Sequence, residues 1–288
     1  MNIAVSIQNL QKSYGEHAVL KGISFNVVQG EIFALLGTNG AGKTTTLECI
    51  EGLRTYTSGQ ILVKGKIGVQ LQSSSLPAHI KASEALTLFS KWNATSINLE
   101  FANPMGLETI KNKAYMELST GQKRRLHLLL AMIGNPDILL LDEPTAGLDV
   151  EARVALHNEI RLLKEQGKTI ILSSHDMAEV ESLCDQMAIL KDGQIAFLGT
   201  LHELTAQIQT TFRIQLKLSS SALFDSLLLS SFLGEQQGYH VFEADDIQNG
   251  LYEILTQVRE KNIRIYDLKL DHISLEQRFM EIAKGGKV

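Results

Sequence analysis

A glycine-rich segment that follows a short apolar run limits this chain to a small group of folds. Residues 32–36 (IFALL) are all apolar, which is typical of a strand buried on both faces, and a helical pattern begins near Lys43. From residue 37 to residue 45 the chain reads GTNGAGKTT. A strand, a glycine loop and a helix in this order form one unit of a mostly parallel sheet, so the sequence predicts an α/β fold.

The glycine segment fits the phosphate-binding pattern G-x-x-x-x-G-K-[ST]. Glycines let backbone N–H groups approach an anion closely, and the following helix adds the partial positive charge of its N-terminus. We expect Lys43 to reach the β- and γ-phosphates of a nucleotide and the Thr44 hydroxyl to bind Mg²⁺. The alternative is a chance glycine turn, which the flanking strand and helix disfavour. The residues predicted to bind nucleotide here are Gly37, Asn39, Gly40, Ala41, Gly42, Lys43, Thr44 and Thr45.

A second apolar run, residues 138–141, is followed directly by two carboxylates, Asp142 and Glu143. Ligands of open α/β sheets bind at this end of the strands. Asp142 is predicted to hold Mg²⁺ through water, and Glu143 to polarise an attacking water as a general base. An apolar strand that ends in Asp-Glu is common by itself and is then more often structural. Its occurrence together with the phosphate loop favours the catalytic interpretation.

A third segment, LSTGQKRRL at residues 118–126, marks the start of a helix. Ser119 is followed three residues later by Gln122, which is the spacing of a capping box. Taken alone, this pattern indicates only a capped helix. The functional alternative is a second anion site, because the first N–H groups of a helix are available to a phosphate.

The order of GTNGAGKTT, LSTGQ, LLLDEP and SSH (173–175) resembles the ATP-binding subunits of ABC transporters. The resemblance implies a P-loop ABC-type ATPase core with an antiparallel β edge and a helical subdomain at about residues 73–135. It also implies ATP and Mg²⁺ as cofactors, with ATP held between the phosphate loop of one subunit and the LSTGQ signature of another. The implied nucleotide contacts outside the loop are Tyr14, Ser119, Gly121, Gln122 and Asp149.

Three of the residues in this resemblance also have structural alternatives. Tyr14 matches the aromatic that stacks on adenine, but a lone tyrosine is more often a surface or core residue. His175 matches a catalytic histidine that contacts the γ-phosphate, but a lone histidine more often caps or fills a core. Asp149 matches the loop that crosses to the second subunit, and it also fits the N-cap of a helix. Their shared register with the other motifs favours the functional interpretation.

Gln72 matches the glutamine that joins the core to the helical subdomain and senses the γ-phosphate and Mg²⁺. It is therefore assigned to both the catalytic and the metal-binding residues. Gln70 is a competing candidate, but the spacing from Ile67 favours Gln72. The chain departs from the family pattern at Thr120, where the signature usually has glycine. The segment between Gln72 and Leu118 is also short, which affects the expected shape of the permease-docking groove.

A smaller accessory domain is predicted at residues 211–288, after an ATPase domain at 1–210. Its alternating and helical patterns are those of a small α+β unit. The elements expected in it are a half-exposed strand at 212–218, an amphipathic helix at 247–258, a strand at 263–268 and a final helix at 274–283.

The segments ISLEQRF (273–279) and KRRL (123–126) loosely resemble bacterial ABC-2-type drug and lipid exporters. This resemblance implies export through a separate integral membrane permease, with a second copy of the chain or a paralogous ATPase subunit as partner. No run approaches the roughly 20 apolar residues that span a bilayer, and no signal peptide is visible. We therefore expect a peripheral location at the cytoplasmic face of the cell membrane, through the permease.

Charge and composition disfavour one rival, a soluble ABC-type ATPase that acts on ribosomes or DNA. The formal net charge is −5 and aromatic residues make up 6% of the chain. Nucleic-acid binding instead favours clustered lysine and arginine and stacking aromatics, so we expect no nucleic-acid partner. Another alternative is a nucleotide-regulated binding subunit that hydrolyses too slowly to drive transport, and the acidic Glu143 favours hydrolysis over it.

Overall fold

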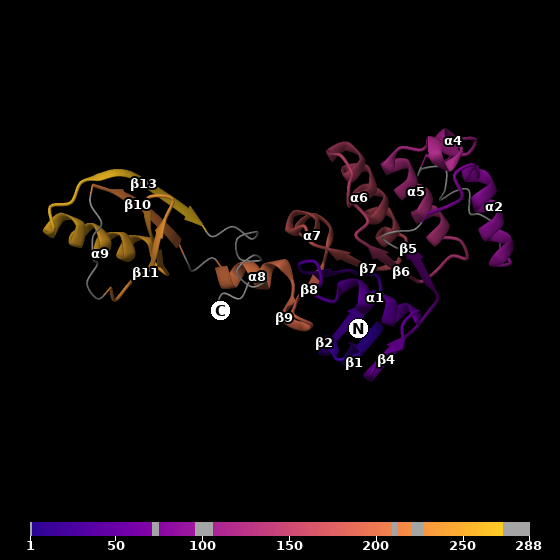
Figure 1. Cartoon of the computed structure of the whole chain (residues 1–288), viewed down its shortest axis with the longest axis horizontal. Helices are drawn as coiled ribbons and strands as arrows, with labels where there is room; N and C mark the ends of the chain where they lie inside the picture. Colours follow the sequence, from indigo (N-terminus) through magenta and orange to yellow (C-terminus); the bar gives the residue numbers. More distant parts are fainter. Residues whose placement is uncertain (1, 71–74, 96–105, 209–211, 220–226, 273–288) are drawn as a thin grey trace. The chain divides into compact units, whose positions relative to one another are not determined.

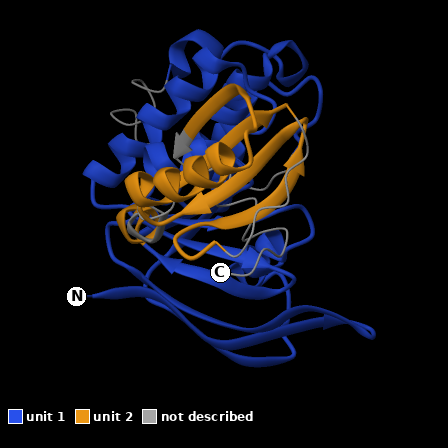
Figure 2. Ribbon diagram, turned by 90° about the vertical axis from the view of Figure 1, so that its left-hand side faces the viewer, with its two compact units in different colours: residues 1–199 blue, residues 200–288 orange. Residues whose placement is uncertain are grey.

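The structure is a computed structural model that describes residues 2–70, 75–95, 106–208, 212–219 and 227–272. Contacts between residues divide the chain into two compact units, 1–199 and 200–288 (Figure 2). Helix α8 (Leu201–Ile208) falls in the second unit, whereas the boundary expected from the sequence follows residue 210.

A six-stranded sheet forms the centre of the first unit. In spatial order its strands are β5 (Ile67–Gln70), β6 (Ile138–Asp142), β7 (Thr169–Ser174), β3 (Ile32–Leu36), β8 (Gln186–Lys191) and β9 (Gln194–Gly199). Neighbours pair in parallel except β8 and β9, which form an antiparallel hairpin around Asp192. Every residue of β3, β6 and β7 is buried, which explains the nearly continuous apolar sequences of β3 and β6. The predicted α/β fold is confirmed.

A three-stranded antiparallel sheet supplies the β edge that the resemblance implied. In spatial order its strands are β2 (His17–Val28), β1 (Ile3–Tyr14) and β4 (Ser58–Val63). Helix α1 (Lys43–Glu51) contacts β2 of this sheet and also β6 and β7 of the large sheet. It therefore joins the two sheets, as can be followed in Figure 1.

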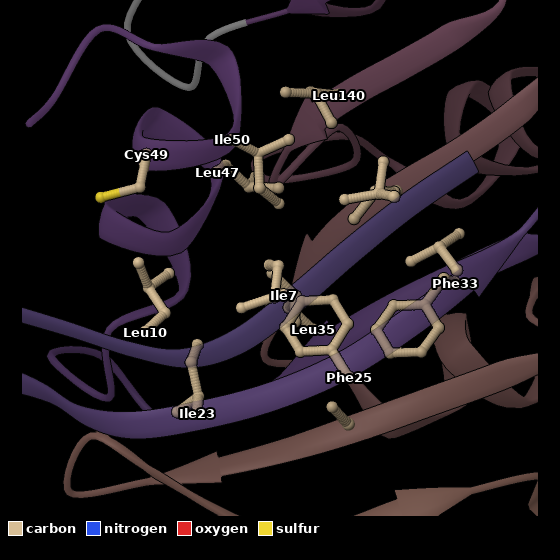
Figure 3. Close-up of a cluster of buried hydrophobic side chains, with 14 of the residues drawn as sticks. Ile7, Leu10, Ile23, Phe25, Phe33, Leu35, Leu47, Cys49, Ile50 and Leu140 are labelled. Carbon is tan, nitrogen blue, oxygen red and sulfur yellow. The ribbon is translucent and has the colours of Figure 1, made fainter. Parts of the chain in front are cut away.

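Apolar side chains fill the space among α1 and the two sheets. Figure 3 shows Leu47 and Ile50 of α1 with Ile7, Phe25 and Phe33 from the strands, all of them buried. The rings of Phe25 and Phe33 stack with centroids 5.0 Å apart. Such a pair adds about 0.5–1.5 kcal/mol beyond the burial of its area. This packing anchors α1 and so fixes the position of its first residue, Lys43.

The segment from residue 73 to 135, expected to be helical, contains four short helices in its described part. They are α2 (Ala82–Trp92), α4 (Leu107–Ile110), the 3₁₀ helix η1 (Tyr115–Glu117) and α5 (Thr120–Ala131). Helix α5 contacts β5 at the edge of the sheet and also α6 (Val150–Glu165), while α7 (Met177–Leu183) contacts β3 and β7. None of the helices in the described residues is both long and apolar enough to cross a bilayer.

The second unit contains an antiparallel sheet and helix α9 (Ile247–Glu260). In spatial order the strands are β11 (Ser231–Gln236), β12 (Tyr239–Ala244), β10 (Phe212–Leu218) and β13 (Ile265–His272). Ile254 and Val258 of α9 pack on Ile214 and Phe242 of the sheet, which gives this unit a core of its own. Strands β10 and β13 and helix α9 match predicted elements, whereas the β11–β12 hairpin was missed. The helix predicted at 274–283 lies outside the described residues.

Substituting Phe33 by alanine is expected to destabilise the first unit by about 3–5 kcal/mol, because the ring is fully buried and its removal leaves a cavity. The matched control is Leu62→Ala on β4, where the side chain is 51% exposed and the expected loss is about 0.5 kcal/mol or less. Urea unfolding followed by circular dichroism measures both. Equal losses in the two variants would contradict the assignment of the core.

Candidate functional site

The loop between β3 and α1 encloses the side chain of Lys43. Its Nζ atom donates hydrogen bonds to the carbonyl oxygens of Gly37 at 2.8 Å and Thr38 at 3.2 Å. Gly42, directly before the helix, has a φ of 106°, a backbone conformation that residues with a side chain rarely adopt. At Gly37 a Cβ atom would lie 2.6 Å from the carbonyl oxygen of Leu190. The path of the backbone therefore requires glycine at both positions.

A cavity of about 510 Å³ opens beside this loop, within the size range of small-molecule sites. The Lys43 side chain is 5% exposed. Burial lowers the pKa of its ammonium group, and the carboxylates of Glu143 and Asp142 oppose this shift. A glycine loop at a helix N-terminus, with a cation and hydroxyl groups, suits a polyphosphate. The residues that line the cavity are His17, Val19, Asn39, Gly40, Gly42, Lys43, Thr44, Thr45 and Glu143.

Asp142 ends β6 with its carboxylate beside the first turn of α1. The Thr44 hydroxyl lies 3.0 Å from one carboxylate oxygen and 3.3 Å from the other. The Ser173 hydroxyl, at the end of β7, also donates to this carboxylate. Hydroxyl and carboxylate oxygens are ligands that Mg²⁺ accepts, so the chemistry of this pair fits that ion.

Glu143 has an uncommon backbone conformation. Its φ is 45°, in the left-handed region that residues other than glycine seldom adopt, and its N–H donates to the Ser173 hydroxyl at 3.0 Å. Its Oε1 atom lies 3.6 Å from Lys43 Nζ and 3.3 Å from His175 Nδ1. Sparsely populated conformations cost about 1–3 kcal/mol and cluster at functional sites. Glu143 and His175, both predicted to be catalytic, thus lie together beside the lysine of the loop.

The signature residues gather around a second cavity. Ser119 caps α5: its hydroxyl accepts the Gln122 N–H at 3.2 Å, and Gln122 Oε1 accepts the Ser119 N–H at 3.2 Å, so the predicted capping box is confirmed. Asp149 caps α6 by accepting the Ala152 N–H at 2.8 Å. A Cβ atom at Gly121 would come 3.0 Å from the Ala152 Cβ, so glycine lets α5 and α6 approach here. Ser119, Gly121, Gln122 and Asp149 line this cavity of about 230 Å³.

Tyr14 and Gln72 are the two predicted site residues that remain to be located. Tyr14 ends β1, is 42% exposed and lies under the Lys12 ammonium group, which is 4.8 Å from the ring centroid. It is His17, paired with Tyr14 in the β1–β2 hairpin, that lines the cavity at the loop. Gln72 lies outside the described residues. The competing Gln70 ends β5 with a 1% exposed side chain whose amide has no hydrogen-bond partner among the described residues.

A family profile and several known proteins are similar to this chain. The family profile described as "ABC transporter" matches residues 20–146. An uncharacterized ABC transporter ATP-binding protein of Methanocaldococcus jannaschii is 39% identical over 71% of this chain and 80% of its own length. The Nod factor export ATP-binding protein I of Burkholderia orbicola is 38% identical over 71% and 73%. The linearmycin resistance ATP-binding protein of Bacillus subtilis is 30% identical over 96% of both chains.

Solved structures show the same fold. The ATP-binding subunit of an ABC transporter superposes with a TM-score of 0.63 at 28% identity, and covers 71% of this chain and 92% of its own. The ADP conformation of an ATP-binding cassette of an ABC transporter gives a TM-score of 0.66 at 21% identity, over 72% and 95%. Fold, motifs and relatives agree, and this chain belongs to the ATP-binding subunits of the ABC transporter family, which are ATPases.

Proposed function

We propose that this subunit hydrolyses ATP to drive export through a separate integral membrane permease, at the cytoplasmic face of the cell membrane. Two similar proteins are named for Nod factor export and for linearmycin resistance, and the second matches nearly the whole chain, including residues beyond the ATPase core. Co-purification with a co-expressed polytopic membrane protein tests whether the subunit binds a permease. Recovery of the subunit without any membrane partner would contradict it.

The single observation that supports hydrolysis best is the cluster of a cation, two carboxylates and a histidine beside the phosphate loop. Glu143, which directly follows Asp142, lies 3.6 Å from Lys43 and 3.3 Å from His175. In the proposed site the loop N–H groups and Lys43 bind the β- and γ-phosphates of ATP. Thr44, Asp142 and Gln72 hold Mg²⁺, which offsets phosphate charge when it is bound.

Glu143 is proposed as the general base. Its carboxylate accepts a proton from water, the water oxygen forms a bond to the γ-phosphorus, and the bond from that phosphorus to the β–γ bridging oxygen breaks. His175, whose side chain is 55% exposed and whose Nδ1 atom lies 3.3 Å from Glu143, is proposed to contact the γ-phosphate. The product is ADP with inorganic phosphate.

The separate location of the two cavities supports a two-subunit site. The phosphate loop and the signature each line a cavity of their own within one chain. We propose that ATP binds between the loop of one subunit and Ser119, Gly121 and Gln122 of a second copy or a paralogous subunit, with Asp149 close to the junction. Thr120, which replaces the usual glycine, is exposed, so its side chain can point away from the nucleotide.

Lys43→Ala is expected to weaken ATP binding about 10–100-fold, because a hydrogen-bonded cation contributes roughly 1.5–3 kcal/mol to binding a phosphate. Isothermal titration calorimetry with ATP measures the affinity. The control is Lys21→Ala, an exposed lysine of β2, which should bind like the wild type. An affinity of Lys43→Ala within about threefold of wild type would place the phosphates elsewhere.

Glu143→Gln is expected to bind ATP while its turnover falls by about 10²–10⁴, because an amide of the same size cannot take the proton from water. Steady-state phosphate release measures turnover, and size-exclusion chromatography with ATP should show a trapped dimer. Glu165→Gln, an exposed glutamate of α6, is the matched control. Turnover near the wild-type rate would mean that the base is another residue.

Residues 211–288 are proposed to act in regulation or assembly, because the motifs and cavities that support ATP hydrolysis lie in residues 1–199. A chain that ends after Ala206 should keep its ATP affinity but change its dimer lifetime or its transport with the permease. Circular dichroism first establishes that the shortened chain is folded. A folded chain that binds no ATP would contradict this division of roles.

A further inference from the structure

Beneath the proposed hydrolytic site lies a buried carboxylate, Glu179 of α7, which is 2% exposed. Its Oε1 atom accepts a hydrogen bond from the Thr145 hydroxyl at 2.8 Å, and its Oε2 atom accepts one from the Ser174 hydroxyl at 2.5 Å. Both hydroxyls are themselves buried. Each carboxylate oxygen therefore binds a different segment of the chain.

The two segments are the ones that carry the proposed catalytic side chains. Thr145 lies two residues after Glu143 in the loop that follows β6, and Ser174 directly precedes His175 at the end of β7. Glu143 and His175 approach each other to 3.3 Å. The same four residues and Glu179 line a small cavity of about 130 Å³. Glu179 is therefore the common partner of two loops whose separation determines the Glu143–His175 contact.

Contacts with α6 extend this network. His157 Nε2 lies 3.6 Å from Glu179 Oε1, and His157 Nδ1 lies 3.3 Å from the Ser182 hydroxyl. Arg153 pairs with Asp176 at 2.9 Å. Helix α6 begins directly after Asp149, so the network joins the residues around His175 to the helix that follows the proposed subunit-crossing loop.

A carboxylate at this depth is costly unless its oxygens are hydrogen-bonded, and removing one partner of such a buried group destabilises strongly. The hydroxyl bonds of Glu179 are therefore strong constraints on both loops. None of them is made to the phosphate loop or the signature, and the link to the loop is indirect, through the Ser174 carbonyl oxygen that accepts the Gly37 N–H at 3.2 Å. An effect of Glu179 should accordingly be larger in the chemical step than in the affinity for nucleotide.

We propose that Glu179 is a positioning residue, which holds Glu143 and His175 in the geometry for hydrolysis through Thr145 and Ser174. This inference rests on the proposed function of the same site. A displacement of about 1 Å in a reacting group is enough to slow catalysis by about 10²-fold. Glu179 does not touch the phosphates in this account, so it is not a catalytic residue.

The test is Glu179→Gln in the full chain, with the exposed Glu181→Gln on the same helix as matched control. The amide keeps the volume, but its NH2 group can only donate, so one of the two hydroxyls must turn from donor to acceptor, and both bonds lose the charge of the carboxylate. The kcat for ATP hydrolysis is expected to fall about 10–100-fold while the Kd for ATP stays within about threefold. The control should match wild type in both.

A folded Glu179→Gln variant with kcat within threefold of wild type would overturn the inference. Parallel losses of kcat and ATP affinity would also overturn it, because they indicate a merely structural role. If the variant does not fold, Thr145→Val replaces it, with the same expected split of kcat and Kd and with rescue by Thr145→Ser, which keeps the hydroxyl. A wild-type chain without ATPase activity would instead refute the proposed function.

Discussion

The parallel pairing of β3, β6 and β7 decides where the reactive groups of this protein lie. Leu36 at the end of β3 pairs with Ser174, and Asp142 at the end of β6 pairs with Ser173, so the three strands end at one level of the sheet. The phosphate loop, the carboxylate pair and the segment before His175 leave the sheet from these ends. A shift of one residue in either pairing would turn the alternate side chains to the opposite face and disperse the site.

Because β3, β6 and β7 end at one level of the sheet, charged side chains that follow these strands lie close together. One buried ammonium group, Lys43, lies close to two carboxylates, Asp142 and Glu143, beside the cavity at the phosphate loop. A polyphosphate that enters meets the cation and the loop N–H groups, but it also meets two negative side chains. Repulsion between like charges is strong in such surroundings. This is the physical reason to include a divalent cation in the proposed site, beside Thr44 and Asp142.

Local signals in the sequence were sufficient for much of this arrangement. Continuous apolar runs identified β3 and β6, glycines identified the loop, and Ser119 and Asp149 were recognisable as helix caps because a cap and its N–H partner lie within three residues. Interactions between distant residues were not recognisable. Glu179 binds Thr145, 34 positions away, and His17 lines the same cavity as the phosphate loop although it lies well before that loop in the sequence. The role of Gln72 and the boundary of the accessory domain stay predictions.

A crystal structure of the Glu143→Gln chain with ATP and Mg²⁺ would show whether ATP binds between the phosphate loop of one subunit and the signature of another. We expect two subunits with each ATP between them, its β- and γ-phosphates against Lys43 of one copy and its γ-phosphate against Ser119 of the other. Mg²⁺ should lie beside Thr44 and Asp142 of the first copy. Phosphates bound away from Lys43, or an ATP held entirely by one subunit in a structure without a dimer, would contradict it.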